Sequence, residues 1–323
     1  MNSSECGTHN GRSTSLPAGA AEPASPGRRR SAPSGGSEPR EAGSAGAPER
    51  SAGPPQASSA PSGGSEPREA GSVGAPSPWP YPRWIAHRGA GKLAPENTLA
   101  AFKLGGSHGY RMFECDVKLS ADGKAFLLHD ATLDRTSNGH GTAGESDWAA
   151  LSLLDAGSWH SAAFAGEPLP QLASIAQYCL AHGHLLNIEI KPTPGQEAVT
   201  GSVVANLVAN LWAQADVPPL LTSFQVASLA AARHAQPELP RGLLLDTMTP
   251  DWIATALELG CVAVVLNYRL WNEATVAQAK GAGLRTLSYT VNDEAAAQKL
   301  MDIGTDGLIT DRVDLFRPDS NLP

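Results

Sequence analysis

Short β-rich runs alternate with helical segments through most of the chain, and this alternation limits the possible folds more than any other feature. The segments between most of the runs place Ala, Leu, Ile or Val at helical spacing, and several of them end at Gly. Continuous apolar runs such as VAVVL indicate strands that are covered on both faces, as in a parallel sheet. The runs lie at residues 84–87, 112–119, 125–130, 185–191, 220–224, 241–246, 261–268, 285–291 and 306–311.

About eight strand-helix units in roughly 240 residues match the length of a closed (β/α)₈ TIM barrel, which is the α/β fold that we predict. An open doubly wound sheet is the alternative. Its dinucleotide fingerprint is matched only by the relaxed form GAGKLA after the first run, with Pro95 close behind, and no GxxxxGK[ST] motif occurs. The barrel therefore explains the sequence better, and its active site is expected at the carboxyl ends of the strands.

The first 78 residues differ from the rest in composition. They are almost entirely Ser, Gly, Ala, Pro, Glu and Arg, without an apolar run that could form a core, so we expect residues 1–78 to be disordered. The segment that starts at Ala32 recurs almost unchanged from Ala60, and it has no hydrophobic face to stack, which indicates a duplicated linker. The predicted organisation is this extension, a barrel domain over residues 79–318 and a tail over residues 319–323.

Charge and cysteine content narrow the class of protein. Residues 1–78 hold seven Arg and seven Glu, so the net charge of −8 falls on the rest of the chain, which argues against a nucleic-acid partner. No apolar segment typical of an export signal follows the arginines at 28–30, and no stretch approaches the roughly 20 apolar residues of a membrane span. The four cysteines show neither metal-binding spacing nor a disulfide framework. We predict a cytoplasmic protein without membrane insertion, and the oligomeric state stays open.

Polar side chains follow or end four of the apolar runs. Residues two apart on a strand face the same way, so Glu114 and Asp116 share one face, with Cys115 pointing toward the helices. In a barrel these polar side chains are expected to converge on one rim. They are His87 and Arg88, Glu114 and Asp116, His129 and Asp130, and Glu189 and Lys191.

Three carboxylates at one rim repel one another unless a cation joins them. Oxygen ligands without thiols suit Mg²⁺, Ca²⁺ or Mn²⁺ better than zinc, so a divalent cation is the predicted cofactor. The two histidines can transfer protons near neutral pH, and Arg88 and Lys191 offer positive charge to an anion. Together these groups indicate a site for a phosphoester.

The motifs occur in one order along residues 80–318: HRGAGKLAPENTLAAF, FECDVKLSADG, HDATLDRTSNGHG, LDAGSWHSAAFAGEPLPQL, NIEIK and YTVND. This series resembles that of the bacterial glycerophosphodiester phosphodiesterases. The resemblance implies Mg²⁺ or Ca²⁺ ligands at Glu114, Asp116 and Glu189, general acid and base catalysts at His87 and His129, and phosphate contacts from Arg88 and Lys191. It also implies that an insertion over about residues 130–170 shapes the glycerol side of the mouth. Tyr289 departs from the family, which more often has Trp before TVN.

The implied activity is metal-assisted hydrolysis of a small glycerophosphodiester to sn-glycerol 3-phosphate and an alcohol. His87 is expected to act as base and His129 as acid, and either the glycerol 2-hydroxyl or water attacks phosphorus. Three alternatives stay open: a rim network of ion pairs without metal, a catalytically silent barrel that binds glycerophospho head groups, and a related phospholipase-type phosphodiesterase. The sequence leaves open which alcohol is released and which metal is bound.

Five further residues have two interpretations each. Asn97 before the first helix and Asn292 after YTV fit substrate contact and fit capping or a turn about equally well. Phe224 and Trp271 near strand ends either pack against substrate or fill the core and rim. Asp311 is interpreted as a strand-end turn residue, with contact to the catalytic loops as the alternative.

Overall fold

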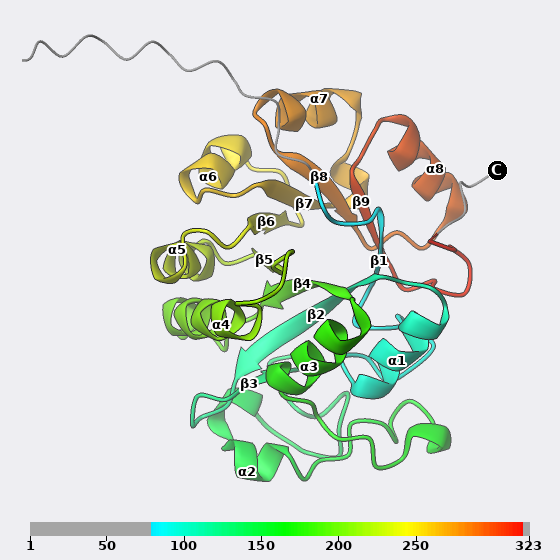
Figure 1. Cartoon of the computed structure of the whole chain (residues 1–323), viewed down its shortest axis with the longest axis vertical. Helices are drawn as coiled ribbons and strands as arrows, with labels where there is room; N and C mark the ends of the chain where they lie inside the picture. Colours follow the sequence, from blue (N-terminus) through cyan, green and yellow to red (C-terminus); the bar gives the residue numbers. More distant parts are fainter. Residues whose placement is uncertain (1–78, 319–323) are drawn as a thin grey trace, which may run out of the picture. The chain divides into compact units, whose positions relative to one another are not determined.

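The computed structural model describes residues 79–318, and Figure 1 shows a ring of strands surrounded by helices. The predictions for residues 1–78 and 319–323 fall outside the described residues. Within residues 79–318, eight parallel strands are hydrogen-bonded in the order β1-β9-β8-β7-β6-β5-β4-β2, and β2 also pairs with β1, which closes the barrel. The predicted (β/α)₈ barrel is therefore confirmed. The barrel strands are β1 (Trp84–Ala86), β2 (Met112–Leu119), β4 (Leu185–Ile190), β5 (Leu220–Ser223), β6 (Arg241–Leu245), β7 (Ala263–Asn267), β8 (Arg285–Tyr289) and β9 (Gly307–Thr310).

The run at 125–130 is a strand, but it is not part of the parallel barrel. Its residues Ala125–Leu127 form β3, which pairs antiparallel with the end of β2. Only residues 120–124 connect the two strands, and Gly123 adopts a φ of 76° in this turn. A parallel crossover needs a dozen or more residues, so a connection this short can only return the chain as a hairpin.

Helices cover the outside of the barrel. The residues from 130 to 170 form an insertion below it in Figure 1, with α2 and the 3₁₀ turns η1 (Ala143–Glu145) and η2 (Ala162–Phe164). Leu133 and Leu151 of this insertion pack with Phe126 of β3 in a small core that is separate from the two larger ones. The helices are α1 (Leu99–Ser107), α2 (Trp148–Leu151), α3 (Leu172–His182), α4 (Glu197–Leu211), α5 (Val226–Ala235), α6 (Trp252–Glu258), α7 (Glu273–Gly281) and α8 (Glu294–Asp302), and a further 3₁₀ turn, η3 (Tyr268–Leu270), follows β7.

Alternation along each strand separates the interior of the barrel from the layer beneath the helices. Met112, Val265 and Leu287 belong to a cluster inside the barrel, whereas Cys115 and Ile188 pack in the larger cluster that includes helix residues. The odd and even positions of β2 therefore face opposite sides, as the sequence predicts. As a result, Glu114 and Asp116 point inward near the carboxyl end of the barrel.

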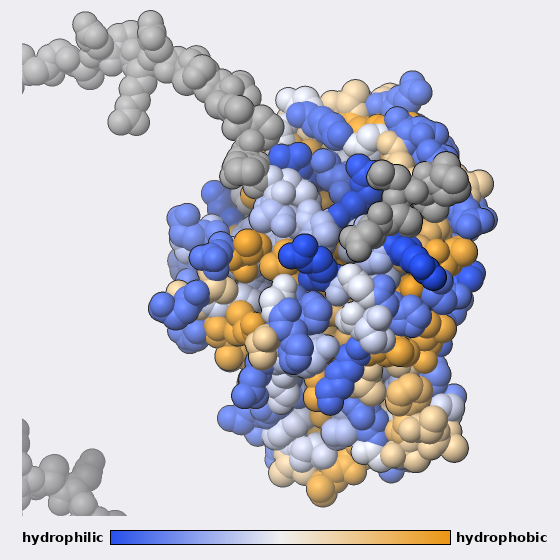
Figure 2. Space-filling view, turned by 45° about the vertical axis from the view of Figure 1, so that its right-hand side comes forward, coloured by the Kyte–Doolittle hydropathy of each residue, from blue (hydrophilic) through white to orange (hydrophobic). Residues whose placement is uncertain are grey.

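The surface is mainly polar on the face shown in Figure 2, where hydrophobic side chains lie in separate patches. None of the helices within residues 79–318 has the length and apolar character needed to cross a membrane.

Candidate active site

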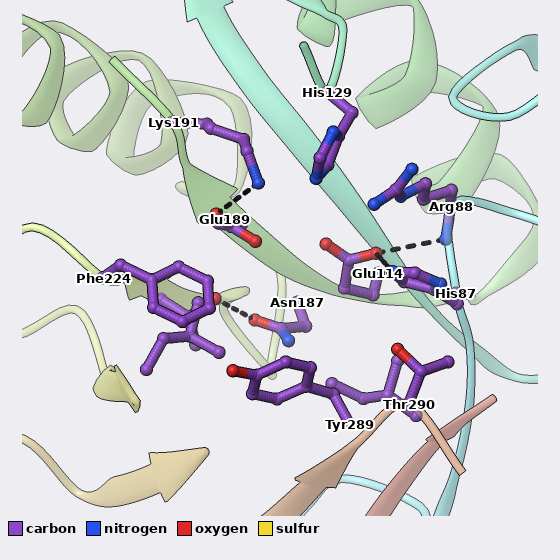
Figure 3. Close-up of a pocket in the computed structure, with 13 residues that line it drawn as sticks. His87, Arg88, Glu114, His129, Asn187, Glu189, Lys191, Phe224, Tyr289 and Thr290 are labelled. Carbon is purple, nitrogen blue, oxygen red and sulfur yellow. Dashed lines mark hydrogen bonds and ion pairs between the residues drawn. The ribbon is translucent and has the colours of Figure 1, made fainter. Parts of the chain in front are cut away.

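The carboxyl ends of β1, β2 and β4 and the second residue after β3 bring most of the predicted side chains around one cavity. This cavity has a volume of about 160 Å³ and opens at the mouth of the barrel (Figure 3). Asp116 lies directly beside Glu114 and Glu189. The predicted convergence on one rim is confirmed. The predicted residues that line the cavity are His87, Arg88, Glu114, His129, Glu189, Lys191 and Phe224.

Three buried carboxylates form a cluster at the cavity, and two of them, Glu114 and Glu189, line it. Glu114, Asp116 and Glu189 each place one oxygen within 4.8 Å of the others, and they are 3%, 1% and 8% exposed. Burial and the charges of Asp116 and Glu189 raise the pKa of Glu114 well above its usual value. Burial and the charge of Asp116 raise the pKa of Glu189 to about 7. Burial alone would also raise the pKa of Asp116, but the charges of Arg88 and Lys191 outweigh it and lower that pKa.

Two cations touch this cluster from opposite sides. Arg88 places Nε 3.3 Å from Asp116, and its backbone N–H donates to Glu114 at 3.1 Å. Arg88 has a φ of 51°, an uncommon conformation for a side chain other than Gly, Asn or Asp. Lys191 Nζ donates to Glu189 at 3.0 Å and lies 3.5 Å from Asp116. The ion pairs of the rim-network interpretation are therefore present, but two cations do not neutralise three buried carboxylates.

The cluster has the donor chemistry of a site for a hard divalent cation. Its ligands are oxygen atoms alone, they are close enough to share one ion, and only two cations among the described residues, Arg88 and Lys191, face the three carboxylates. An oxygen-liganded cation therefore fits the residues that are present.

The His87 ring, which follows β1, contacts a carboxylate that follows the neighbouring strand β9. Nδ1 of His87 lies 2.6 Å from Oδ1 of Asp311, which follows β9, while Nε2 faces Glu114 at 3.8 Å. A carboxylate accepts hydrogen bonds, so in the uncharged form of the ring the proton lies on Nδ1 and Nε2 carries the lone pair. Burial raises the pKa of Asp311, but the hydrogen bond and charge of His87 and the hydrogen bond from Asn292 lower it to about 2 overall. His87 is thus oriented to accept a proton at Nε2.

The His129 ring has a separate carboxylate. Nδ1 of His129 lies 2.7 Å from Asp130, and Arg135 holds Asp130 through Nε at 2.6 Å. Arg135 also makes two bonds of 2.8 Å to Glu96, which in turn accepts from Arg88 at 2.8 Å. Burial lowers the pKa of His129, so the uncharged ring predominates at neutral pH. A chain of charged groups therefore joins the two sides of the site.

Residues 87–315 match the Glycerophosphoryl diester phosphodiesterase family, and this match covers more than half of the chain. The protein belongs to this family. Among curated relatives, the glycerophosphodiester phosphodiesterase of Bacillus subtilis is 30% identical over 247 residues, which cover 72% of this chain and 84% of the relative. That of Caldanaerobacter subterraneus is 32% identical over 227 residues, which cover 70% of this chain and 93% of the relative.

Solved structures agree with the family assignment. A phosphodiesterase from Oleispira antarctica, in complex with the product sn-glycerol-3-phosphate, is 34% identical, covers 71% of this chain and 93% of its own, and superposes with a TM-score of 0.67. A glycerophosphodiester phosphodiesterase from Agrobacterium tumefaciens is 28% identical, covers 73% and 99% of the two chains, and gives a TM-score of 0.62. The expectations of the fold, the family and an enzyme are confirmed.

Asn97 and Asn292, two candidates for substrate contact, do not line the cavity. Asn97 donates from Nδ2 to Asp116 at 2.8 Å and accepts from the Asp116 backbone N–H, and Thr98 rather than Asn97 caps α1. Asn292 donates to Asp311 at 2.8 Å and accepts from the backbone N–H of that residue at 2.8 Å. Both asparagines therefore brace a carboxylate. Asp311, interpreted as a turn residue, is the partner of His87.

The aromatic candidates have different places. Phe224 is 36% exposed at the mouth and packs edge-on against Tyr289 at 5.8 Å between ring centroids. Trp271 is 1% exposed, donates to the Leu287 carbonyl and packs near Trp252, so it belongs to the core. Phe224 is thus the aromatic candidate that reaches the cavity.

The sequence interpretation missed Glu96, Arg135 and Lys118. The first two are charged residues inside the motifs PENT and LDRT, and their proximity depends on how the insertion folds back. Lys118 had a local signal, because it continues the face of β2 that carries Glu114 and Asp116. It is 2% exposed, and burial together with the charge of Lys191 lowers its pKa to about 8.

Proposed function

We propose that this protein hydrolyses glycerophosphodiesters to sn-glycerol 3-phosphate and the free alcohol. The observation that carries the proposal is the buried cluster of Glu114, Asp116 and Glu189 beside two imidazoles that each contact a carboxylate of their own. The relative from Oleispira antarctica supports the choice of product, because it was solved with sn-glycerol-3-phosphate.

We propose Mg²⁺ or Ca²⁺ as the cofactor, held by one oxygen from each of the three carboxylates. When bound, such an ion supplies positive charge for the phosphate oxygens as negative charge develops on them. Arg88 and Lys191 lie on either side of the same cluster and would bind the phosphate of the substrate. The substrate phosphate is thereby placed between His87 and His129.

His87 is proposed as the general base. Its Nε2 accepts the proton of the attacking hydroxyl, while Asp311 holds the ring by Nδ1 and stabilises the positive charge that the ring gains. Two nucleophiles suit this geometry, namely the 2-hydroxyl of the glycerol moiety, which gives a cyclic phosphate, and a water molecule. ³¹P NMR of the reaction distinguishes them, since only the first route produces a transient cyclic ester.

His129 is proposed as the general acid. In its protonated form it donates a proton from Nε2 to the oxygen of the leaving alcohol, and Asp130 favours that form through Nδ1. Burial acts in the other direction and makes the imidazolium a stronger acid. On the cyclic route the second step exchanges the roles of the two histidines, and water opens the ring.

The test is release of sn-glycerol 3-phosphate from glycerophosphoglycerol, glycerophosphoinositol and glycerophosphocholine, measured with a coupled assay. We expect activity that EDTA removes and that Mg²⁺ or Ca²⁺ restores. His129→Ala is expected to lower kcat by about 10²- to 10⁴-fold. His140→Ala is the matched control, because His140 lies in the same insertion and pairs with Asp134 at an exposed position.

Release from none of these diesters with either metal would contradict the proposal and favour a barrel that binds glycerophospho head groups without turnover. Activity that survives EDTA would contradict the metal assignment alone. An equal loss in the His129 and His140 variants would contradict the role of His129.

We also propose that residues 79–318 form the catalytic domain and that the protein works in the cytoplasm without a nucleic-acid partner. Cys115, Cys179 and Cys261 are free and buried, which suits a reducing compartment. The net charge of −8 argues against nucleic acid. Deleting residues 1–78 is expected to leave kcat/KM unchanged, and cell fractionation tests the location.

A further inference from the structure

A second cavity adjoins the candidate active site. It has a volume of about 330 Å³ and shares His129, Glu189, Lys191 and Phe224 with the first cavity. Figure 3 shows Lys191, Glu189 and Phe224 together on the side away from His87. A phosphodiester carries two organic groups that leave the phosphorus in different directions. Two cavities that share the residues proposed to face the phosphate could each hold one of these organic groups.

Lys118 distinguishes the second cavity from the first. It lines only the second one, on the same face of β2 as Glu114 and Asp116, and it is 2% exposed. Its ammonium group donates to the backbone carbonyl of Lys191 at 3.1 Å. Within residues 79–318 its nitrogen has no carboxylate oxygen at ion-pair distance, although the charges of Asp116, Glu189 and Asp130 act on it from farther away. An ammonium group has three N–H donors, so two remain for other partners.

One carboxylate, that of Glu189, also lines the second cavity, but it is already paired with Lys191 Nζ at 3.0 Å. Pro192 and Pro194 contribute apolar surface, and Ser223 contributes a hydroxyl that donates to the Ile190 carbonyl. The ring of Phe224 could attract a cation, but the ammonium of Lys191 already lies 5.9 Å from its centroid. A positively charged group that enters this cavity would therefore meet two lysine ammonium groups, of which only that of Lys191 is paired with a carboxylate.

We propose that the second cavity binds the alcohol half of the diester, and that Lys118 selects alcohols that carry hydroxyl or anionic groups over alcohols that carry a quaternary ammonium. This inference rests on the proposed function. Hydroxyl groups of glycerol or inositol can accept the free N–H donors of Lys118, whereas the trimethylammonium group of choline offers no acceptor and is repelled.

The test compares kcat/KM for glycerophosphoglycerol, glycerophosphoinositol and glycerophosphocholine, using the full-length protein. We expect the wild type to prefer each of the two polyol diesters over the choline diester by about 10-fold or more. Lys118→Met keeps the length of the side chain but removes the charge, and it should shift this preference toward choline by about 10-fold. Lys118→Arg keeps the charge and should keep the preference.

Lys124→Met is the matched control, because Lys124 is exposed in the turn after β2, and this variant should behave as the wild type. An equal effect of Lys118→Met on all three substrates would overturn the inference, since the residue would then act on the shared glycerophosphate half. A wild-type preference for the choline diester would also overturn it. Both results leave hydrolysis intact, whereas turnover of none of the three diesters would refute the proposed function and with it this inference.

Discussion

Replacing Asp311 with Asn tests whether His87 depends on its distant carboxylate. In the wild type, Oδ2 of Asp311 accepts from Asn292 and Oδ1 contacts Nδ1 of His87. If the new amide oxygen keeps the bond from Asn292, its NH₂ group faces Nδ1 and forces the ring proton onto Nε2. A protonated Nε2 cannot accept a proton, so we expect kcat to fall by about 10²- to 10⁴-fold, the usual contribution of a general base.

The same substitution has a defined effect on stability. The pKa of Asp311 falls from the usual 3.8 to about 2, which corresponds to about 2 kcal/mol at about 1.36 kcal/mol for each pK unit. Its side chain is only 17% exposed, so screening by solvent is limited. A carboxylate with a lowered pKa stabilises the fold above its unfolded-state pKa, and that stability is lost as the pH falls toward the folded-state value. Asp311→Asn should therefore cost about 2 kcal/mol at neutral pH, and the difference should shrink between about pH 4 and pH 2.

Urea unfolding at several pH values and steady-state kinetics measure the two effects. Asp314→Asn is the control, because Asp314 forms an exposed ion pair with Arg312 and should change stability by less than about 1 kcal/mol. The reasoning is refuted if Asp311→Asn keeps kcat within about threefold of the wild type, or if its stability deficit is independent of pH.

Three other substitutions test the supports around the site. Arg135→Gln breaks bonds to two carboxylates at a partly exposed position, so we expect a cost of about 1 kcal/mol in thermal unfolding and a fall in kcat of about 10-fold. Asn97→Ala removes both bonds to Asp116 at a φ of 60°, which should cost about 2–4 kcal/mol and weaken Mg²⁺ or Ca²⁺ binding in calorimetry by about 10- to 100-fold. Gly91→Ala should lower the free energy of unfolding by about 2–5 kcal/mol, because Gly91 has a φ of 56° and a Cβ there would lie 2.1 Å from the backbone oxygen of Asp311. Gly109→Ala is the control: a Cβ there meets open space, so the loss should be about 1–2 kcal/mol.

Specific results would contradict each of these expectations. An Arg135→Gln variant that loses stability as expected but keeps the kcat of the wild type would show that the residue has a structural role only. For Asn97 the contradicting result is metal binding as tight as in the wild type. For Gly91 it is a stability equal to that of the Gly109 variant, which would mean that the backbone near Asp311 moves without strain.

Local patterns predicted the fold class and most of the residues that line the site. The spacing of apolar residues, which alternates between that of a strand and that of a helix, identified these elements, because spacing within one element depends on a few neighbouring residues. The direction of β3 could also have been inferred, since residues 120–124 are too few for a parallel crossover. Parity along β2 placed Glu114 and Asp116 on one face, and it would have placed Lys118 there as well.

Partners of these side chains were harder to predict. Asp311 is 224 residues from His87 in the sequence, and they meet because β9 pairs with β1 when the barrel closes. Asn97 has the sequence position of a helix cap, yet its backbone conformation turns its amide toward Asp116 on the neighbouring strand.

The sequence by itself thus determined that the chain builds a (β/α)₈ barrel and that acidic, basic and imidazole groups lie at its carboxyl rim. The tertiary structure alone decided which carboxylate holds which histidine, which asparagine braces which acid, and that Lys118 is buried with no carboxylate oxygen at ion-pair distance among the described residues. The physical reason is the distance along the chain over which each effect acts. The spacing of apolar residues and the alternation of side chains along a strand depend on a few neighbouring residues. Hydrogen-bond partners and burial depend on the closure of the barrel and on the way the insertion folds back toward it.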